Sequence, residues 1–194
     1  MFAGIEINPD KTFTVALMDK NRNIYYISHY WKEGLFWFLD HTKIKILTIN
    51  INHSDKKYFQ QKWKNLLELK DTLTSSFEFE IFEGMIHEKT LLFTDTDLFF
   101  KEAVRKELLP IYTREGLEQR IYNLPKSGIH IPENFLSRDR RKLRGEVNAV
   151  VSAFTSFSIE NKLYSTEEIE GEVFFVPVYK FVPKEKRVIT ASRF

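Results

Sequence analysis

The order of β-rich and helical segments is the feature that most constrains the fold of this chain. Three β-rich runs, over 2–7, 12–18 and 24–31, come first, separated by the turn-forming sequences NPDK and DKNRN. A short helical segment at 33–42, a β-branched run at 43–51 and an amphipathic helix at 55–73 follow. Hairpins followed by alternating strands and helices predict a mixed sheet with helices on both faces. We therefore expect an α/β fold whose sheet has five strands or slightly more.

The second half of the chain adds further strands and helices. The β-rich runs lie at 77–82, 89–95 and 171–179. The expected helices run from Asp97, as the capping residue, to Leu108, from Thr113 to Leu124, and from Phe135 to Asn161. Pro177 interrupts the last strand, which places that strand at a sheet edge. Because the sequence contains no repeat and no low-complexity linker, we expect one domain over 1–194 with a short basic C-terminal tail.

Composition limits the chemistry that the chain can perform. The sequence has 0 Cys, which excludes disulfides, thiolate zinc sites and a cysteine nucleophile. That composition is compatible with a reducing cytoplasm, where we expect the protein to act. The net charge of +2 is too small to make the whole molecule a polycation. The sequence shows neither a signal peptide nor an apolar run near the ~18 residues of a membrane span, so no membrane partner is expected.

Three motifs occur in a fixed order behind a first strand that carries Gly4-Ile5-Glu6. They are TREGLEQRIYNL at 113–124, EVNAVVSAFTSF at 146–157 and EGEVFFVPV at 170–178. With these motifs and this element order, the chain resembles the ribonuclease H-like superfamily, and within it a widespread bacterial and archaeal group of predicted nucleases. The resemblance implies a ribonuclease H-like fold. If the protein is catalytic, it also implies Mg²⁺ or Mn²⁺ as cofactor.

The same resemblance identifies the positions at which the family carries acidic residues. Its first-strand Asp corresponds to Glu6, and its fourth-strand acid falls at Asn50 or Asn52. Its helix acid falls at Asn148, with Glu146 two residues earlier. Two-metal phosphodiester hydrolysis needs several converging carboxylates, and an Asn side chain supplies no negative charge. The resemblance therefore implies an eroded two-metal site with Asn50 and Asn148 at former acid positions.

Three acidic residues remain as candidates for the site. We consider Glu6 and Glu146 as catalytic residues, and Glu6 and Asp95 as metal ligands. Glu6 in a buried strand either binds a metal ion, pairs with a Lys or Arg, or faces a solvent-filled groove. Helical spacing places Glu146 and Asn148 on opposite flanks of an apolar stripe, so we expect a solvated Glu146 and a surface or hydrogen-bonding Asn148. Asp97 is expected to cap a helix, with a role as a carboxylate ligand as its alternative.

The segment RDRRKLR places five basic side chains around the start of the longest predicted helix. These are Arg138, Arg140, Arg141, Lys142 and Arg144. Cations near a helix N-terminus oppose the helix dipole, so a bound phosphate or an acidic partner would explain them, with a solvated face as the alternative. The tail adds four more cations: Lys184, Lys186, Arg187 and Arg193. Nucleic-acid binding through such residues would consist of backbone contacts and would depend steeply on salt.

These observations leave three hypotheses. The leading one is a ribonuclease H-like domain with an eroded metal site that binds nucleic acid or a protein partner. The second is an active Mg²⁺- or Mn²⁺-dependent nuclease that uses Glu6 with Asp95, Asp97 or Glu146. The third is a structural protein that forms a homodimer through exposed aromatic residues of IYYISHYW, at 24–31. Whether the protein is an enzyme stays open at this point.

Overall fold

The computed structural model describes residues 1–52, 60–104 and 107–178. The strands of the central sheet are β1 (Phe2–Ile7), β2 (Phe13–Met18), β3 (Ile24–Tyr30), β4 (Ile46–Asn50), β5 (Glu80–Ile81) and β6 (Thr90–Thr94). The helices are α1 (Lys32–His41), α3 (Gln60–Ser75), α4 (Thr96–Val104), α5 (Arg114–Asn123), α6 (Arg140–Glu160) and the short η1 (Pro125–Ser127). A separate hairpin consists of β7 (Tyr164–Ile169) and β8 (Glu172–Pro177). The predicted cations of the tail and residues 55–59 of a predicted helix lie outside the described residues.

The central sheet has the strand order β3-β2-β1-β4-β6-β5. The first three strands pair antiparallel, whereas β4, β6 and β5 extend the sheet in parallel from β1. The predicted α/β mixed sheet is confirmed, with six strands. The run at 77–82 forms a strand only at Glu80–Ile81, because only these two residues pair with β6. The parallel arrangement brings the carboxyl ends of β1, β4 and β6 to one edge of the sheet.

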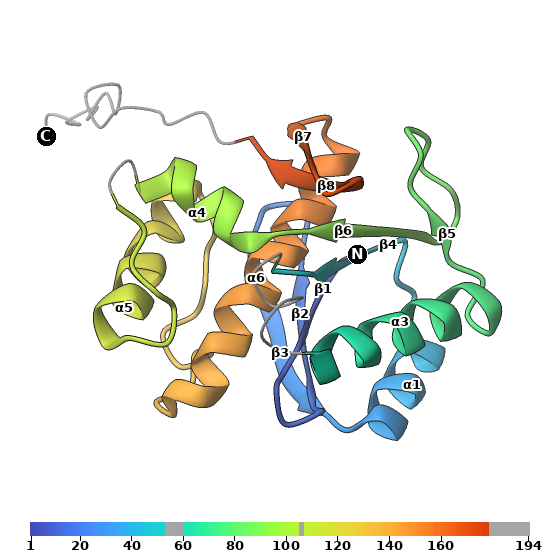
Figure 1. The fold of residues 1–194 in the computed structure, drawn as a ribbon, viewed down its shortest axis with the longest axis horizontal. Coiled ribbons are helices and arrows are strands. Elements are labelled where there is room, and N and C mark those ends of the chain that lie inside the picture. The colour runs from blue at the N-terminus through green and yellow to red at the C-terminus, as the bar shows by residue number, and fades with distance from the viewer. Residues whose placement is uncertain (53–59, 105–106, 179–194) are drawn as a thin grey trace, which may run out of the picture.

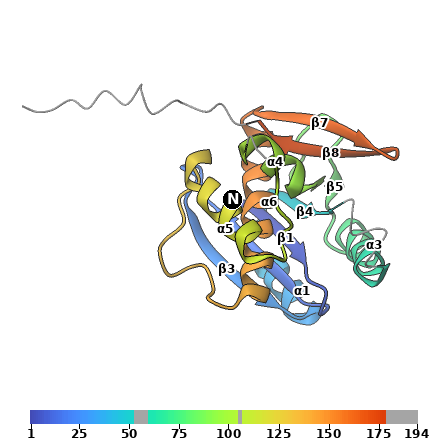
Figure 2. The same cartoon turned by 60° about the vertical axis from the view of Figure 1, so that its left-hand side comes forward.

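Helices cover both faces of the sheet (Figure 1), and each face has its own hydrophobic core. One core contains buried residues of α4, α5 and α6, and the other contains buried residues of α1 and α3. Strand β1 serves both: Phe2 belongs to the first core, and Ala3, Ile5 and Ile7 belong to the second. This division follows the alternation of side chains along a strand. Figure 2 shows the β7–β8 hairpin beside α4 and far from α1.

Helix α6 lies at the centre of the molecule, and every residue from Gly145 to Ile159 is buried. It begins at Arg140, five residues later than predicted, because Asp139 caps it by accepting a 2.8 Å hydrogen bond from the Arg141 backbone N–H. The helix packs directly on β1 at Gly4, where a Cβ atom would lie 2.2 Å from the Ala149 carbonyl oxygen. With the sheet on one side and α4, α5 and the hairpin on others, no flank of its central part faces solvent.

The ends of two other elements also differ from the prediction. Asp95, and not Asp97, caps α4, since its Oδ1 accepts a 2.9 Å hydrogen bond from the Asp97 backbone N–H. The prediction of a cap at Thr113 is confirmed, because its side chain accepts from the Gly116 N–H. Strand β7 was not predicted, and it is the partner against which β8 pairs. The described part of α4 ends at Val104, and 105–106 lie outside the described residues.

Candidate functional site

A cleft of about 580 Å³ opens at the carboxyl ends of β1 and β4. Its walls come from the β1–β2 turn, the end of β4, α3, α4, the α4–α5 connection and the first turns of α6. In open α/β sheets, ligands bind outside the carboxyl ends of the strands. The cleft therefore lies where this class of fold holds its ligands, and its side chains decide which ligand is suitable.

Glu6 is a buried acid at the base of this cleft, with 4% of its surface exposed. Its Oε1 accepts a 2.7 Å hydrogen bond from the Lys62 Nζ, and its Oε2 accepts a 2.6 Å bond from the Asn50 Nδ2. A carboxylate can be buried at tolerable cost when a cation and a further donor replace its water. Of the alternatives that the sequence left open, the structure gives Glu6 a lysine partner.

Asn50 and Asn148, at which the resemblance expects acids, lie in one hydrogen-bonded network with Glu6. The Asn50 Oδ1 accepts from the Thr96 backbone N–H at 3.0 Å, and the Thr96 hydroxyl donates to the Asn148 Oδ1 at 3.1 Å. Asn148 is buried and lines the cleft, as does Asn52. Of the two alternatives predicted for Asn148, the structure shows the hydrogen-bonding residue and not the surface residue. The three asparagines thus bring amide groups, and no negative charge, to this end of the sheet.

The acid that α4 contributes to the cleft is Asp97, which the sequence assigned to helix capping. Asp97 Oδ1 accepts a 2.7 Å hydrogen bond from Nη2 of Arg120, and the Arg120 side chain is almost fully buried. Asp95, the predicted metal ligand, is buried and caps α4. The helix cap is therefore Asp95 and the cleft acid is Asp97, the reverse of the prediction, because α4 begins two residues earlier than the sequence indicated.

The donor set of the cleft does not fit a two-metal centre. Within the described ranges, no group of three or more His, Cys, Asp or Glu side chains could hold a metal ion. The two carboxylates that line the cleft, Glu6 and Asp97, each already accept a hydrogen bond from a cationic side chain. A pair of metal ions needs several carboxylates that converge on them. The described residues therefore supply neither the number of acids nor acids without cationic partners.

The predicted basic cluster divides into two groups. Arg141 and Arg144 line the cleft, whereas Arg138, Arg140 and Lys142 are exposed away from it. Arg141 and Arg144 are one helical turn apart and so lie on the same face of α6. In the part of the chain that the structure describes, neither guanidinium forms an ion pair with a carboxylate. Lys62 offsets Glu6 and Arg120 offsets Asp97. Among the described residues, the lining therefore carries two positive charges, Arg141 and Arg144, that no carboxylate offsets.

Glu146, the second predicted catalytic acid, lies outside the cleft. It is 3% exposed, and its Oε1 lies 2.9 Å from the His29 Nε2 while its Oε2 accepts from the Ser137 backbone N–H at 2.7 Å. The expectation of a solvated Glu146 is wrong, because β3 and the segment before α6 enclose that flank of the helix. Glu6 lines the cleft and Glu146 does not, so the structure does not bring these two predicted catalytic acids into one cavity.

Arg120 also explains the motif TREGLEQR in physical terms. Its Nη1 donates to the carbonyl oxygens of Leu109 and Gly116, and its guanidinium lies 5.4 Å from the centre of the Phe100 ring. Gly116 lies so close to the α4–α5 connection that a Cβ atom would be 2.1 Å from the Pro110 carbonyl oxygen. The motif thus fixes one wall of the cleft.

Sequence reasoning missed Lys62, Arg120 and Tyr112 as residues of the site. The partner of Lys62 is 56 positions away along the chain, and no local pattern marks such a pair. Arg120 lies within the motif TREGLEQR, four residues after Gly116. That spacing places the two residues on one face of a helix and was the available signal of their contact. Tyr112 was not distinguished from the other aromatic residues.

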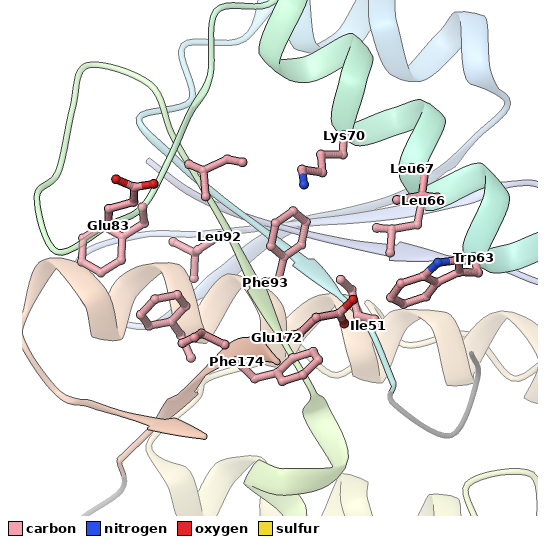
Figure 3. Close-up of a pocket in the computed structure, with 14 residues that line it drawn as sticks. Ile51, Trp63, Leu66, Leu67, Lys70, Glu83, Leu92, Phe93, Glu172 and Phe174 are labelled. Carbon is pink, nitrogen blue, oxygen red and sulfur yellow. The ribbon is translucent and has the colours of Figure 1, made fainter. Parts of the chain in front are cut away.

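A second hollow, of about 410 Å³, lies between α3, β6 and β8 (Figure 3). Apolar side chains such as Trp63, Leu66, Phe93 and Phe174 form most of its lining. The Lys70 Nζ lies 5.9 Å from the centre of the Phe93 ring, and the carboxylate-bearing Glu172 also faces the hollow (Figure 3). We call this hollow the apolar pocket. Its few charged side chains, Lys70, Glu83 and Glu172, are of both signs.

The aromatic strand proposed as a dimer surface is only partly exposed. Tyr26 and Tyr30 of β3 contact each other and pack on the Phe38 ring of α1. Tyr25 and Trp31 are exposed. Half of the aromatic residues of this segment therefore serve the core of the molecule, which leaves a smaller surface for a homodimer than the sequence indicated.

Comparison with protein families, with curated proteins and with solved structures finds no match to this chain. Among the described residues, no helix is both long enough and apolar enough to cross a membrane. Any functional conclusion therefore depends on the geometry and charge of the cleft.

Proposed function

We propose that the chain is a ribonuclease H-like domain that binds the phosphate backbone of nucleic acid in the cleft without hydrolysing it. Three antiparallel strands followed by parallel strand–helix units support the assignment of the fold. The position of Glu6 in β1, with Asn50 and Asn148 beside it, supports a site that descends from a carboxylate cluster. The motifs at 113–124, 146–157 and 170–178 support the same family.

The charge balance of the cleft is the observation that carries this proposal. Each acid of the lining has a cationic partner within 2.7 Å, so the ligand does not need to bring positive charge. Arg141 and Arg144 remain for the ligand, and guanidinium groups bind phosphate oxygens with two parallel hydrogen bonds. The start of α6 adds the positive end of its helix dipole on the same wall. An anionic ligand with repeated phosphates is thus the best match.

Fluorescence anisotropy of a labelled oligonucleotide, measured over a range of salt concentrations, tests the proposal. The logarithm of the binding constant falls as log salt rises. Replacing Arg141 and Arg144 by Ala should make this negative slope shallower by about 1.4, since each phosphate contact on a single strand contributes about 0.7. The matched control is Arg140→Ala with Lys142→Ala, which removes two charges from the same turns of α6 outside the cleft. The control should change the slope much less, and an equal change in both variants would contradict the proposal.

A single-turnover cleavage assay in Mg²⁺ and in Mn²⁺ tests the non-catalytic part separately. We expect the wild-type protein and Glu6→Gln to give the same background rate, because Lys62 and Asn50 already use both oxygens of Glu6. Cleavage by the wild type that Glu6→Gln abolishes would establish the nuclease hypothesis in place of this one.

A further inference from the structure

Tyr112 is an exposed aromatic residue on the rim of the cleft, beside Pro110 and Ile111. It is 73% exposed, and its side chain makes no ring contact or hydrogen bond with the described residues. Tyr122 is similarly exposed but lies outside the cleft, and the Lys126 Nζ lies 3.4 Å from the centre of its ring. Tyr112 therefore presents an unoccupied ring to whatever enters the cleft.

The backbone that carries Tyr112 is held firmly from both sides. The Leu109 carbonyl accepts a 2.7 Å hydrogen bond from Arg120, and the Leu109 N–H donates to the Gln119 Oε1 at 3.0 Å. The Pro110 carbonyl accepts from both the backbone N–H and the hydroxyl of Thr113. Because this segment is already ordered, a ligand that uses the ring loses little affinity to ordering of the protein.

We infer that the cleft binds single-stranded nucleic acid, with a base stacked on Tyr112 and phosphates at Arg141 and Arg144. The inference rests on the proposed function and names the form of nucleic acid. Aromatic rings beside a cationic groove are typical of proteins that bind single strands, because each base offers a face for stacking. In a duplex those faces are covered by the neighbouring bases, so a duplex can use only the arginines.

The test compares three labelled probes of equal length: an oligothymidylate of about twelve nucleotides, the same strand with abasic residues, and its duplex. The abasic strand keeps the phosphates and removes the bases. The wild type should bind the oligothymidylate about tenfold more tightly than the abasic strand, a typical contribution of one stacked base. Tyr112→Ala should abolish this preference, while Tyr112→Phe and the matched control Tyr122→Ala should keep it.

The outcomes separate this inference from the proposed function. Equal affinity of the wild type for strands with and without bases, or tighter binding of the duplex, overturns the inference. If that binding still depends on Arg141 and Arg144, the proposed function stands. A preference for bases that survives Tyr112→Ala also overturns the inference. Failure of every probe to bind at low salt overturns both, and thermal unfolding of each variant confirms that it is folded.

Discussion

The cleft and the apolar pocket share two walls, yet charged and amide side chains line the cleft whereas mostly apolar side chains line the pocket. At the end of β4, Asn52 lines the cleft and the preceding Ile51 lines the apolar pocket. On α3, Lys62 lines the cleft and the following Trp63 lines the apolar pocket. Consecutive residues on a strand or a helix point in different directions. Two hollows of distinct chemistry can therefore share the same elements, because neighbouring residues on one element face different hollows.

The two hollows also differ in what holds their side chains. The walls of the apolar pocket extend the hydrophobic cores, to which Leu66 and Phe174 belong. The cleft depends on ion pairs between segments far apart in the chain, Glu6 with Lys62 and Asp97 with Arg120. Removing one partner of an ion pair in the cleft should therefore lower the free energy of unfolding far more than removing a charge from the apolar pocket.

The largest difference should appear between two lysines of α3. Lys62→Met leaves Glu6 buried without its cation and should lower the free energy of unfolding by about 3–5 kcal/mol. Lys70→Met removes only a contact with the Phe93 ring and should cost less than about 1 kcal/mol. Urea unfolding of both variants gives the comparison.

A double variant completes this experiment. Glu6→Gln together with Lys62→Met removes both charges, so it should recover most of the stability that Lys62→Met loses. Equal stabilities of the two single-lysine variants would show that the Glu6–Lys62 pair does not hold the cleft together.

The second prediction concerns the wall that carries Tyr112. Gly116→Ala should destabilise the protein by about 1–3 kcal/mol, because the new Cβ would overlap the Pro110 carbonyl oxygen. It should also weaken oligonucleotide binding, since the α4–α5 connection must move. The control is Gly34→Ala in α1, whose Cβ would meet only the side chain of Tyr30, at 3.2 Å. Calorimetric unfolding in which the two variants match would contradict the close packing at Gly116.

Asp19, in the β2–β3 turn, is an acid outside both hollows. It shows how much hydrogen bonds to a carboxylate contribute to stability at a site other than that of Glu6. Burial raises its pKa, but hydrogen bonds from the Asn23 side chain and backbone and from the Asn21 backbone outweigh burial and leave the pKa below 3.8. The ionised form therefore stabilises the fold above that pH, and this contribution is lost as the pH falls. Asp19→Asn should cost about 1 kcal/mol near neutral pH.

The pH dependence of this variant is the check. In urea unfolding, the difference between wild type and Asp19→Asn should shrink as the pH falls below 3.8. A difference that stays constant with pH would mean that the charge of Asp19 has no part in holding the turn.

The smallest expected effect has the opposite sign. Arg141→Gln with Arg144→Gln should raise stability by about 0.2–0.5 kcal/mol, because two like charges one turn apart repel each other near a helix N-terminus. The gain should vanish at high salt while oligonucleotide binding stays weakened. A loss of stability in thermal unfolding would instead show that the two guanidiniums serve packing.

Local patterns predicted the elements of the fold better than they predicted the surroundings of single residues. The strand at 2–7 and the cap at Thr113 depend on residues close in sequence, and both were predicted. The pairing of Glu6 with Lys62 depends on how α3 packs beside β1, and nothing local encodes it. Strand β7 has three exposed residues in succession and gains its structure by pairing with β8.

Helix α6 shows why the burial of Glu146 was missed. The sequence pattern indicated an apolar stripe flanked by polar residues, as in a helix with one solvated side. In the structure its buried polar residues find partners both within the helix and outside it: Ser152 donates to the Asn148 carbonyl, whereas Glu146 contacts His29 and accepts from the Ser137 backbone N–H. A stripe therefore indicates which side meets the sheet, but it does not show that the other sides meet water.

The contact at Gly4 fixes the spacing between two elements that contribute walls of the cleft. Because β1 and α6 touch through their backbones there, the separation between the strand that holds Glu6 and the helix that holds Arg144 does not depend on the rotamer of any bulky residue. Side chains on either wall can thus be exchanged over evolution while the width of the cleft stays constant.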